Sequence, residues 1–329
     1  MSTSPQSPQQ VRVQDPILTD FAHGYKHNER VGNLLFPPVP VAVSGGQVLQ
    51  FGKESFRKYH LRRAPGGKKK RITFGYLGKP FSLYQDAMEC PIPYEHMRDA
   101  TVMPGIDLGQ QATTFGMDVI SLQVELDQAG IATNAANYNS NNTVALTGGD
   151  KFSSSTCDVP AKVDEYKEAV RSQIGAYPNV GIFGPSAFVA AKNNPFVVDR
   201  FKYTSPESIT EAMLAQLLGL QRVAVGKSIY FDDDDESEDV WGNNLILAYV
   251  PPLAIQGSVT YAPNGRISMM MPSFGYTYAM DGHPLVEQPY NDRSCDSWIY
   301  PVKHERAPVL TGLEDDGLST SGFLVQGVA

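Results

Sequence analysis

The chain has 329 residues and a mass of 36.0 kDa, which is enough for one large domain or two modest ones. Its formal net charge of -8 argues against a surface that is cationic throughout, as a general nucleic-acid binder would require. The three cysteines are far apart without CxxC spacing, and no apolar run is long enough for a membrane span, so neither a disulfide framework, a zinc site nor a membrane protein is indicated.

Residues 1–48 are predicted to form an N-terminal arm. They carry six prolines and little periodicity, and the proline-rich run at 36–41 favours extended backbone because each proline fixes φ and restricts the residue before it. Residues 1–10 contain no apolar region of the kind that a signal peptide needs. An arm with so few local contacts is expected to become ordered only on a larger surface, such as that of a neighbouring subunit.

A strongly basic segment follows, and residues 49–92 are predicted to form a long two-stranded hairpin loop. Its strands are expected at 48–51 and 71–76, and Ala-Pro-Gly-Gly at 64–67 is typical of the turn between them. A lone hairpin is marginally stable in water, so this one is expected to rest on another surface. The residues predicted to contact another subunit are Arg57, Lys58, Arg62, Arg63, Lys68, Lys69, Lys70 and Arg71.

Three roles fit this basic segment: a solvated face, a phosphate-binding surface, or a surface that docks on acidic residues of another subunit. Aromatic residues lie among the charges and could stack on bases, but strand pairing explains them equally well. Because the chain also contains a strongly acidic run at 232–239, docking between copies is the favoured interpretation.

A long helix is predicted over 107–134, with Asp107 as its N-cap. Apolar residues recur along it at spacings of three and four, which is typical of an apolar helix face. These residues are Phe115, Val119, Leu122, Leu126 and Ala129.

The rest of the chain alternates helices with strands, which indicates a mixed α and β organisation. Helices are predicted at 163–174, after Pro185, and at 209–218. Strands are predicted at 143–146, 180–183, 222–231, 245–250, 273–280 and 297–302.

Two short motifs are similar to enzyme signatures, and both are incomplete. Gly226-Lys227-Ser228 matches the end of a phosphate-binding loop, but Gln221 stands where the first glycine belongs and a strand-like sequence follows instead of a helix. Ser186 lies at a strand-to-helix turn, but Phe188 replaces the last glycine of the nucleophile motif. No catalytic residue is assigned, and the chain is predicted not to be an enzyme.

Metal and cofactor sites are not predicted either. The acidic run at 232–239 lacks the glycine and the ligand spacing of an EF-hand loop, and such a run more often forms a solvated loop. The six histidines include no HExxH pair.

The order of these features resembles the Hong Kong 97 capsid fold of tailed bacteriophages, and the resemblance covers nearly the whole chain. Short sequences are similar to those of phage major capsid proteins, Tyr249-Val250-Pro251-Pro252 among them; each is weak alone, but their order and spacing are specific. They stand at 144–148, 151–153, 177–179, 184–185, 225–230, 240–242, 249–252 and 272–277.

This resemblance implies a major capsid protein that self-assembles into hexamers and pentamers of an icosahedral shell around double-stranded DNA. It implies an α+β fold in which a peripheral domain contains the long helix as its spine. The subunit would be made in the host bacterial cytoplasm and located in the virion capsid. The expected parts are an N-terminal arm (1–48), an extended hairpin loop (49–92), a peripheral domain (93–159), an axial domain (160–270) and strands that return to the peripheral domain (271–329).

The partners implied are copies of the same chain, a portal and a separate scaffold protein, with a decoration protein as a further candidate. The scaffold is expected to be separate because the arm starts within the first residues, where some relatives carry a helical scaffolding segment. Packaged DNA would be contacted without base recognition, since the chain is acidic. Some relatives crosslink a hairpin lysine to an asparagine; no asparagine or promoting acid matches near Lys68, Lys69 and Lys70, so no crosslink is expected.

Three other functions stay open from the sequence. A cytosolic enzyme would require a pocket with convergent polar groups, which no motif indicates. An encapsulin-like nanocompartment shell protein would share the fold and enclose enzymes instead of DNA. A cytosolic DNA-binding protein would act through the basic residues at 53–79 and show salt-sensitive affinity.

Overall fold

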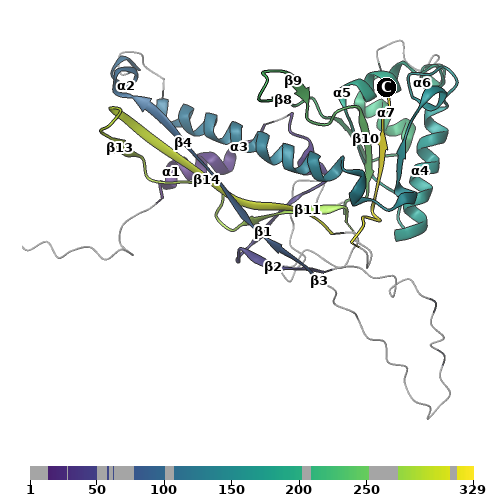
Figure 1. The fold of residues 1–329 in the computed structure, drawn as a ribbon, viewed down its shortest axis with the longest axis horizontal. Helices are drawn as coiled ribbons and strands as arrows, with labels where there is room; N and C mark the ends of the chain where they lie inside the picture. The colour runs from purple at the N-terminus through teal and green to yellow at the C-terminus, as the bar shows by residue number, and fades with distance from the viewer. Residues whose placement is uncertain are drawn as a thin grey trace, which may run out of the picture.

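The computed structural model describes residues 14–27, 29–49, 58, 62, 78–100, 107–201, 209–251, 273–311 and 317–329. Helices and strands are mixed in these parts, which confirms the predicted α+β class. Figure 1 shows a long helix lying along one sheet and, to its right, an α/β body in which helices cover a second sheet. Among the described residues, no helix combines the length and apolar character that a membrane crossing requires.

The first sheet has six strands and is organised around its longest strand, β14 (Ser297–Leu310). β11 (Gly275–Met280) and β4 (Tyr84–Pro93) both pair antiparallel with β14. The shorter strands are β1 (Pro38–Val41), which lies parallel to β11, and β12 (Leu285–Val286) and β13 (Tyr290–Asp292), which pair with β14. Segments far apart in the sequence therefore form one extended surface.

The long helix α3 (Leu108–Ala132) lies on this sheet. Its N-cap Asp107 accepts hydrogen bonds from the backbone N–H groups of Gly109 at 2.9 Å and Gln110 at 3.2 Å, so both the predicted helix and its predicted cap are confirmed. The helix approaches the sheet closely at Gly116, where a Cβ would lie 3.1 Å from the side chain of Val302.

The predicted apolar face of α3 is confirmed in its second half, where Ala129 is buried and Leu122 and Leu126 pack, partly buried, against the same core. In the first half the prediction is wrong, since Phe115 and Val119 are 59% and 41% exposed. In its first half α3 packs on the core of the first sheet, and in its second half it packs on a core shared with the α/β body; the buried residues that do so are Ala112, Met117 and Ile120, then Ala129 and Ala132. Because the helix passes from one core into another, its buried residues do not follow a single stripe.

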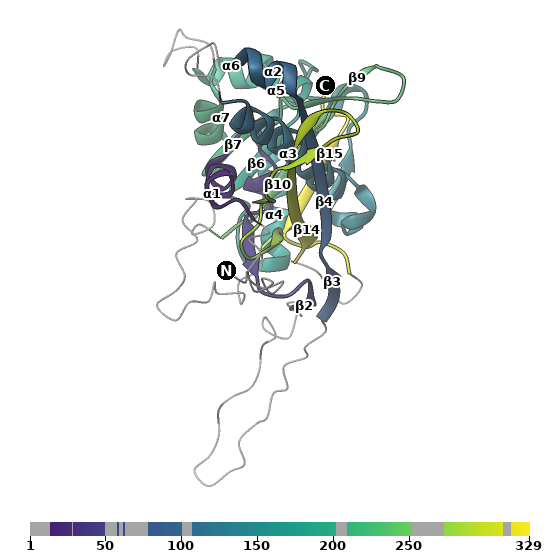
Figure 2. The ribbon, with the colours of Figure 1, turned by 90° about the vertical axis from the view of Figure 1, so that its left-hand side faces the viewer.

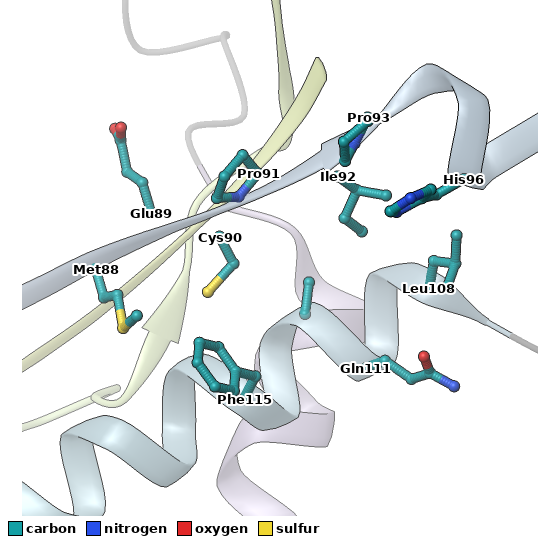
Figure 3. A pocket seen from close by; sticks show the side chains of 11 residues that line it. Met88, Glu89, Cys90, Pro91, Ile92, Pro93, His96, Leu108, Gln111 and Phe115 are labelled. Carbon is teal, nitrogen blue, oxygen red and sulfur yellow. The ribbon is translucent and has the colours of Figure 1, made fainter. Parts of the chain in front are cut away.

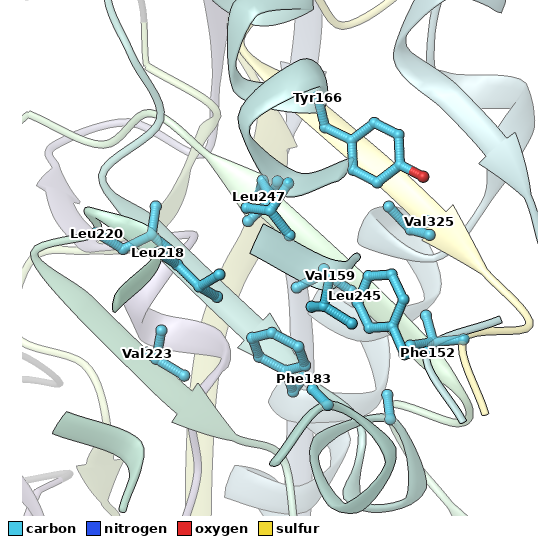
Figure 4. Packing of buried hydrophobic residues seen from close by; sticks show 14 of the residues in the cluster. Phe152, Val159, Tyr166, Phe183, Leu218, Leu220, Val223, Leu245, Leu247 and Val325 are labelled. Carbon is cyan, nitrogen blue, oxygen red and sulfur yellow. The ribbon is translucent and has the colours of Figure 1, made fainter. Parts of the chain in front are cut away.

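The second sheet has five strands in the order β5-β15-β10-β6-β7. These strands are β5 (Thr143–Ala145), β6 (Val180–Phe183), β7 (Arg222–Val225), β10 (Asn244–Ala248) and β15 (Gly322–Gln326). The helices of this body are α4 (Val159–Ile174), α5 (Pro185–Asn193), α6 (Pro195–Phe201) and α7 (Glu211–Leu218). Figure 4 shows its core, where Phe152, Phe183 and Leu245 gather with Tyr166 of α4.

The sequence predicted an extended N-terminal arm, but part of the arm is helical. It contains α1 (Pro16–Gly24), whose N-cap Asp15 accepts from the backbone N–H of Ile17 at 2.9 Å. Further along, Leu35 and Phe36 are completely buried in the core that α3 shares with the α/β body. Burying side chains of this size contributes roughly 2 kcal/mol each. Part of the arm is therefore ordered by its own chain.

One further prediction is corrected. The predicted strand 222–231 is broken, since β7 ends at Val225 and β8 (Ile229–Phe231) belongs to a separate hairpin. The predicted domain bounds stay a prediction. Within them, β4 of the segment 49–92 pairs with β14 in the first sheet. In the second sheet β15, from the segment 271–329, pairs with both β10 and β5, the latter from the segment 93–159.

The remaining elements are short. β2 (Gly45–Leu49) pairs with β3 (Gly78–Ser82), and β8 pairs with β9 (Ser237–Asp239). Both views place β2 and β3 toward the lower end of the molecule and β8 and β9 near its upper end (Figures 1 and 2). The others are α2 (Tyr94–Ala100) and four 3-10 helices, η2 (Gly32–Leu34), η4 (Ala135–Asn137), η5 (Ser140–Asn142) and η6 (Gly148–Asp150).

Candidate assembly surfaces and buried polar contacts

Of the eight basic residues predicted to contact another subunit, the structure describes Lys58 and Arg62, and both are exposed. The segment that carries them starts after β2 and ends before β3, whose antiparallel pairing brings its two ends together. Their role in docking stays a prediction. The predicted turn at 64–67 and the predicted strand at 71–76 lie outside the described residues, as do Arg57, Arg63, Lys68, Lys69, Lys70 and Arg71.

The acidic run at 232–239 was predicted to be a loop and is the turn and second strand of a hairpin. Ile229 of β8 lies opposite Asp239 of β9, and Phe231 lies opposite Ser237. Asp235 in the turn has a φ of 59°, a left-handed conformation that aspartate tolerates better than most residues. Within the parts of the chain that the structure describes, no three His, Cys, Asp or Glu side chains gather in a metal-binding arrangement.

The two incomplete enzyme motifs occupy structural positions. A Cβ at Gly226 would lie 2.1 Å from the indole ring of Trp241, so glycine is required for close packing there. β8 begins shortly after Lys227, where a phosphate-binding loop would need a helix. Ser186 lies in the first turn of α5, which begins at Pro185.

A groove of about 340 Å³ lies between β4 and the first turns of α3. Figure 3 shows Cys90 and Phe115 facing each other across it, whereas the carboxylate of Glu89 points away. Burial raises the pKa of the Cys90 thiol, which keeps the thiol protonated and weakly nucleophilic. This lining can pack against apolar side chains, and its few polar groups do not converge on a reaction centre.

A buried carboxylate joins three segments of the chain. Glu125 of α3 is 1% exposed. Its Oε1 accepts from the backbone N–H of Val31 at 3.0 Å and from Nε1 of Trp241 at 2.7 Å, and its Oε2 accepts from the backbone N–H of Gly32 at 2.9 Å. One side chain therefore holds the arm, the long helix and the α/β body together.

Burial raises the pKa of Glu125, and its three hydrogen bonds together with the charge of Arg30 oppose that rise. The folded protein therefore takes up a proton on Glu125 more readily than the unfolded chain does. The stability that this group contributes is greatest at low pH and decreases as the pH rises through the range in which Glu125 ionises.

A second buried polar contact fixes α3 to the first sheet. Arg306 of β14 is completely buried, and its guanidinium binds Asp86 of β4 at 2.6 Å and Asp127 of α3 at 2.9 Å. The hydroxyl of Tyr84 donates to Asp127 at 3.2 Å. The cation thus connects the helix with two neighbouring strands.

His304 lies two residues before Arg306 on β14. Burial lowers its pKa to about 3, and the positive charges of Arg306 and His283 act in the same direction. The imidazole is therefore neutral at neutral pH.

We expect mild acid to destabilise the fold through His304. An unfolded histidine binds a proton below about pH 6.5, whereas the folded protein does so only near pH 3, so stability that is present above pH 6.5 is lost as the pH falls through this window. His304 is partly exposed, and we expect a loss of roughly 1–2 kcal/mol between pH 7.5 and 5. Urea unfolding at both pH values should show a smaller loss for His304→Gln and an unchanged loss for His96→Gln, in which the histidine is exposed. Equal losses in all three proteins would contradict the assignment.

Sequence reasoning missed both Glu125 and Arg306. Glu125 stands between Val124 and Leu126 in the predicted apolar helix, and a charge within such a pattern is the available signal of a buried polar contact. Arg306 follows Lys303, His304 and Glu305, so its neighbours in the sequence give no such signal. Its partners are distant in the sequence and become visible only with the fold.

No protein-family model matches the chain. The major capsid protein of Burkholderia phage BcepMu is 32% identical over 325 residues, which cover 97% of this chain and 97% of that protein. The crystal structure of a phage-related protein from Bordetella bronchiseptica RB50 is 39% identical, with a TM-score of 0.79, and the match covers 97% of this chain and 99% of the other. The SrpI encapsulin of Synechococcus elongatus PCC 7942 has a TM-score of 0.52 at 10% identity, covering 99% of this chain and 92% of the encapsulin.

The encapsulin match shows a shared fold alone, because its sequence identity is low. The Burkholderia phage match is of a different kind, since its identity extends over nearly the full length of both chains. The capsid function predicted from the sequence is therefore confirmed, together with a location in the capsid and assembly of copies into a shell. This chain belongs to the family of phage major capsid proteins.

Proposed function

We propose that the subunit forms hexamers and pentamers that close an icosahedral shell of the Hong Kong 97 type around double-stranded DNA. The observation that carries this proposal is the full-length similarity to a phage major capsid protein. Closed shells of this kind need subunits that contact neighbours on several sides, so that many modest interfaces add up.

The proposal also assigns a role in the shell to each part of the subunit. The arm (1–48) and the basic segment within 49–92 would reach neighbouring subunits, and the first sheet with α3 would form the peripheral domain. The α/β body, including residues 160–270, would be the axial domain at the centre of each capsomer. Because β5 and β15 lie in the second sheet, the proposal assigns them to the axial domain as well.

The further partners are a portal, a separate scaffold protein and a decoration protein. Packaged DNA would be contacted through charge and shape without base recognition. The subunit would be made in the cytoplasm of the host bacterium. An encapsulin-like compartment is the weaker alternative because its support is fold similarity at 10% identity.

Electron microscopy and sedimentation of the protein, expressed alone and with its neighbouring genes, test the proposal. We expect closed icosahedral shells or capsomer rings in at least one condition. A monodisperse monomer in both conditions would contradict it.

The basic segment gives a sharper prediction. Replacing Lys68, Lys69 and Lys70 by glutamate should block assembly and leave the subunit folded, because the change converts attraction toward an acidic neighbour into repulsion. We expect shell yield to fall at least about tenfold in sedimentation. Normal particles from the variant would contradict a docking role. The matched control reverses three exposed basic residues that are far apart in the sequence, Lys26, Arg200 and Arg293, and should assemble better than the Lys68–Lys70 variant.

A further inference from the structure

The hairpin of β8 and β9 has one face on the body and one exposed face, on which Ile229 and Phe231 lie. Side chains alternate along a strand. Tyr230 packs against the core that contains Trp241, and its hydroxyl donates to Glu238. Its neighbours Ile229 and Phe231 point the other way and are 49% and 67% exposed. Two large apolar side chains therefore lie side by side on the outer face of an ordered strand.

Acidic residues surround this apolar pair. Seven of the eight residues at 232–239 are Asp or Glu, and all eight are exposed. Within the described part of the chain, none of these carboxylates forms an ion pair; nearby Lys227 pairs with Glu211 instead, at 3.7 Å. An exposed phenyl ring and a cluster of unneutralised like charges are both unfavourable in isolation. A partner that combines positive charge with apolar side chains would relieve both.

The chain itself contains a segment with this chemistry. Residues 53–71 carry nine Lys or Arg and a single acidic residue, Glu54. Phe56, Tyr59 and Leu61 are interleaved with these charges. The basic segment thus complements the hairpin in both charge and apolar character.

The placement of the two features favours a contact between copies. The chain enters and leaves the basic segment at β2 and β3, which lie toward the lower end of the molecule in both views, whereas β8 and β9 lie near the upper end (Figures 1 and 2). A contact between two different patches on successive copies can close into a ring.

We propose that the outer face of the β8–β9 hairpin, built on Ile229, Phe231 and the acidic run, is the docking surface for residues 53–71 of a second copy of this chain. The inference rests on the proposed assembly into shells and names the acceptor of the basic segment. The apolar pair supplies burial, and the carboxylates select the basic segment over other apolar partners.

A charge exchange tests the pairing. Asp233→Lys with Asp234→Lys should reduce shell yield at least about tenfold in sedimentation and electron microscopy. Adding Lys68→Glu and Lys69→Glu to the same chain should restore assembly, because every copy then carries both reversed patches and its net charge returns to that of the wild type. The exposed acids of α2 provide the control, and Glu95→Lys with Asp99→Lys should reduce assembly less.

The apolar contribution is tested separately. Phe231→Ser should lower shell yield, whereas Val43→Ser, at a residue that is 61% exposed elsewhere, should not. Circular dichroism and thermal unfolding should be unchanged in the variants of Asp233, Asp234 and Phe231, since these side chains are exposed. The docking proposal would be overturned if the Asp233 and Asp234 variant assembled with the yield of the wild type, or if the charge exchange restored no assembly. In either case the proposed function would stand as long as the wild-type protein forms shells. Absence of shells from the wild type would overturn both.

Discussion

Replacing Glu125 by alanine is expected to lower the free energy of unfolding by about 3–5 kcal/mol, because three buried N–H donors lose their acceptor at once. The donors are the backbone N–H groups of Val31 and Gly32 and the indole of Trp241. Urea unfolding measures the loss, and Gln111→Ala, at an exposed position of the same helix, should change stability by less than about 0.5 kcal/mol.

Indole fluorescence distinguishes a local loss of the hydrogen bonds of Glu125 from a general loss of stability. In a Trp298→Phe background, Trp241 is the only remaining tryptophan, and its emission should shift to longer wavelength in Glu125→Ala under conditions where the fold persists. Glu125→Gln should lie between the wild type and the alanine variant, since an amide keeps one acceptor but turns an NH2 group toward N–H donors. A destabilised variant with an unchanged Trp241 spectrum would contradict the claim that Glu125 connects α3 with Trp241.

The position of Glu125 explains why one residue has such a large expected effect. The first half of α3 belongs to the core of the first sheet, and its second half belongs to the core shared with the α/β body. The N-terminal segment that contains Leu35 and Phe36 enters this second core. Glu125 therefore accepts hydrogen bonds where three parts of the subunit meet, so its removal is expected to weaken more than one of them.

Elements with strong local signals could be predicted from the sequence. The N-cap and length of α3 and the bounds of β6 agree with the structure because capping residues and apolar runs act locally. β14 was predicted to end at 302 and continues to Leu310. Pro308 lacks a ladder donor, yet pairing with β11 over 306–310 continues the strand.

Elements that depend on distant contacts could not be predicted in the same way. α1 carries a local start signal in Asp15 and Pro16, but the prolines around it favoured an extended arm. β15 inserts between β5 and β10, and no local pattern says which sheet a short apolar strand will join. The same holds for the exposed Phe115, since periodicity finds an apolar face but not what covers it.

The candidate contact surfaces and buried contacts could likewise be predicted only in part from the sequence. The basic and acidic segments could be predicted from composition, because charge is visible in the sequence. The alternation that turns Tyr230 inward and Phe231 outward required the hairpin geometry. Arg306 could not be assigned a role before its two aspartate partners were placed beside it.

Removing the buried guanidinium of Arg306 is the second change with a large expected effect. Arg306→Met keeps much of the apolar volume but leaves Asp86 and Asp127 close together without their cation. Breaking one side of a buried ion pair typically costs about 3–5 kcal/mol, and we expect a loss of this size in urea unfolding. The exposed pair of Arg98 and Asp99 is the matched control, and Arg98→Met should cost less than about 1 kcal/mol.

A neutral replacement of the whole cluster separates the charge effect from packing. Arg306→Met combined with Asp86→Asn and Asp127→Asn removes the unpaired carboxylates and should recover most of the lost stability, since the cost of a broken buried pair lies largely in the charges left behind. Recovery in the triple variant would show that the cluster orients α3 on β4 and β14 without being the main source of stability. If the triple variant were as unstable as Arg306→Met, the contact of the guanidinium with the ring of Tyr84, whose centroid lies 5.7 Å from the guanidinium carbon, would be the dominant contribution.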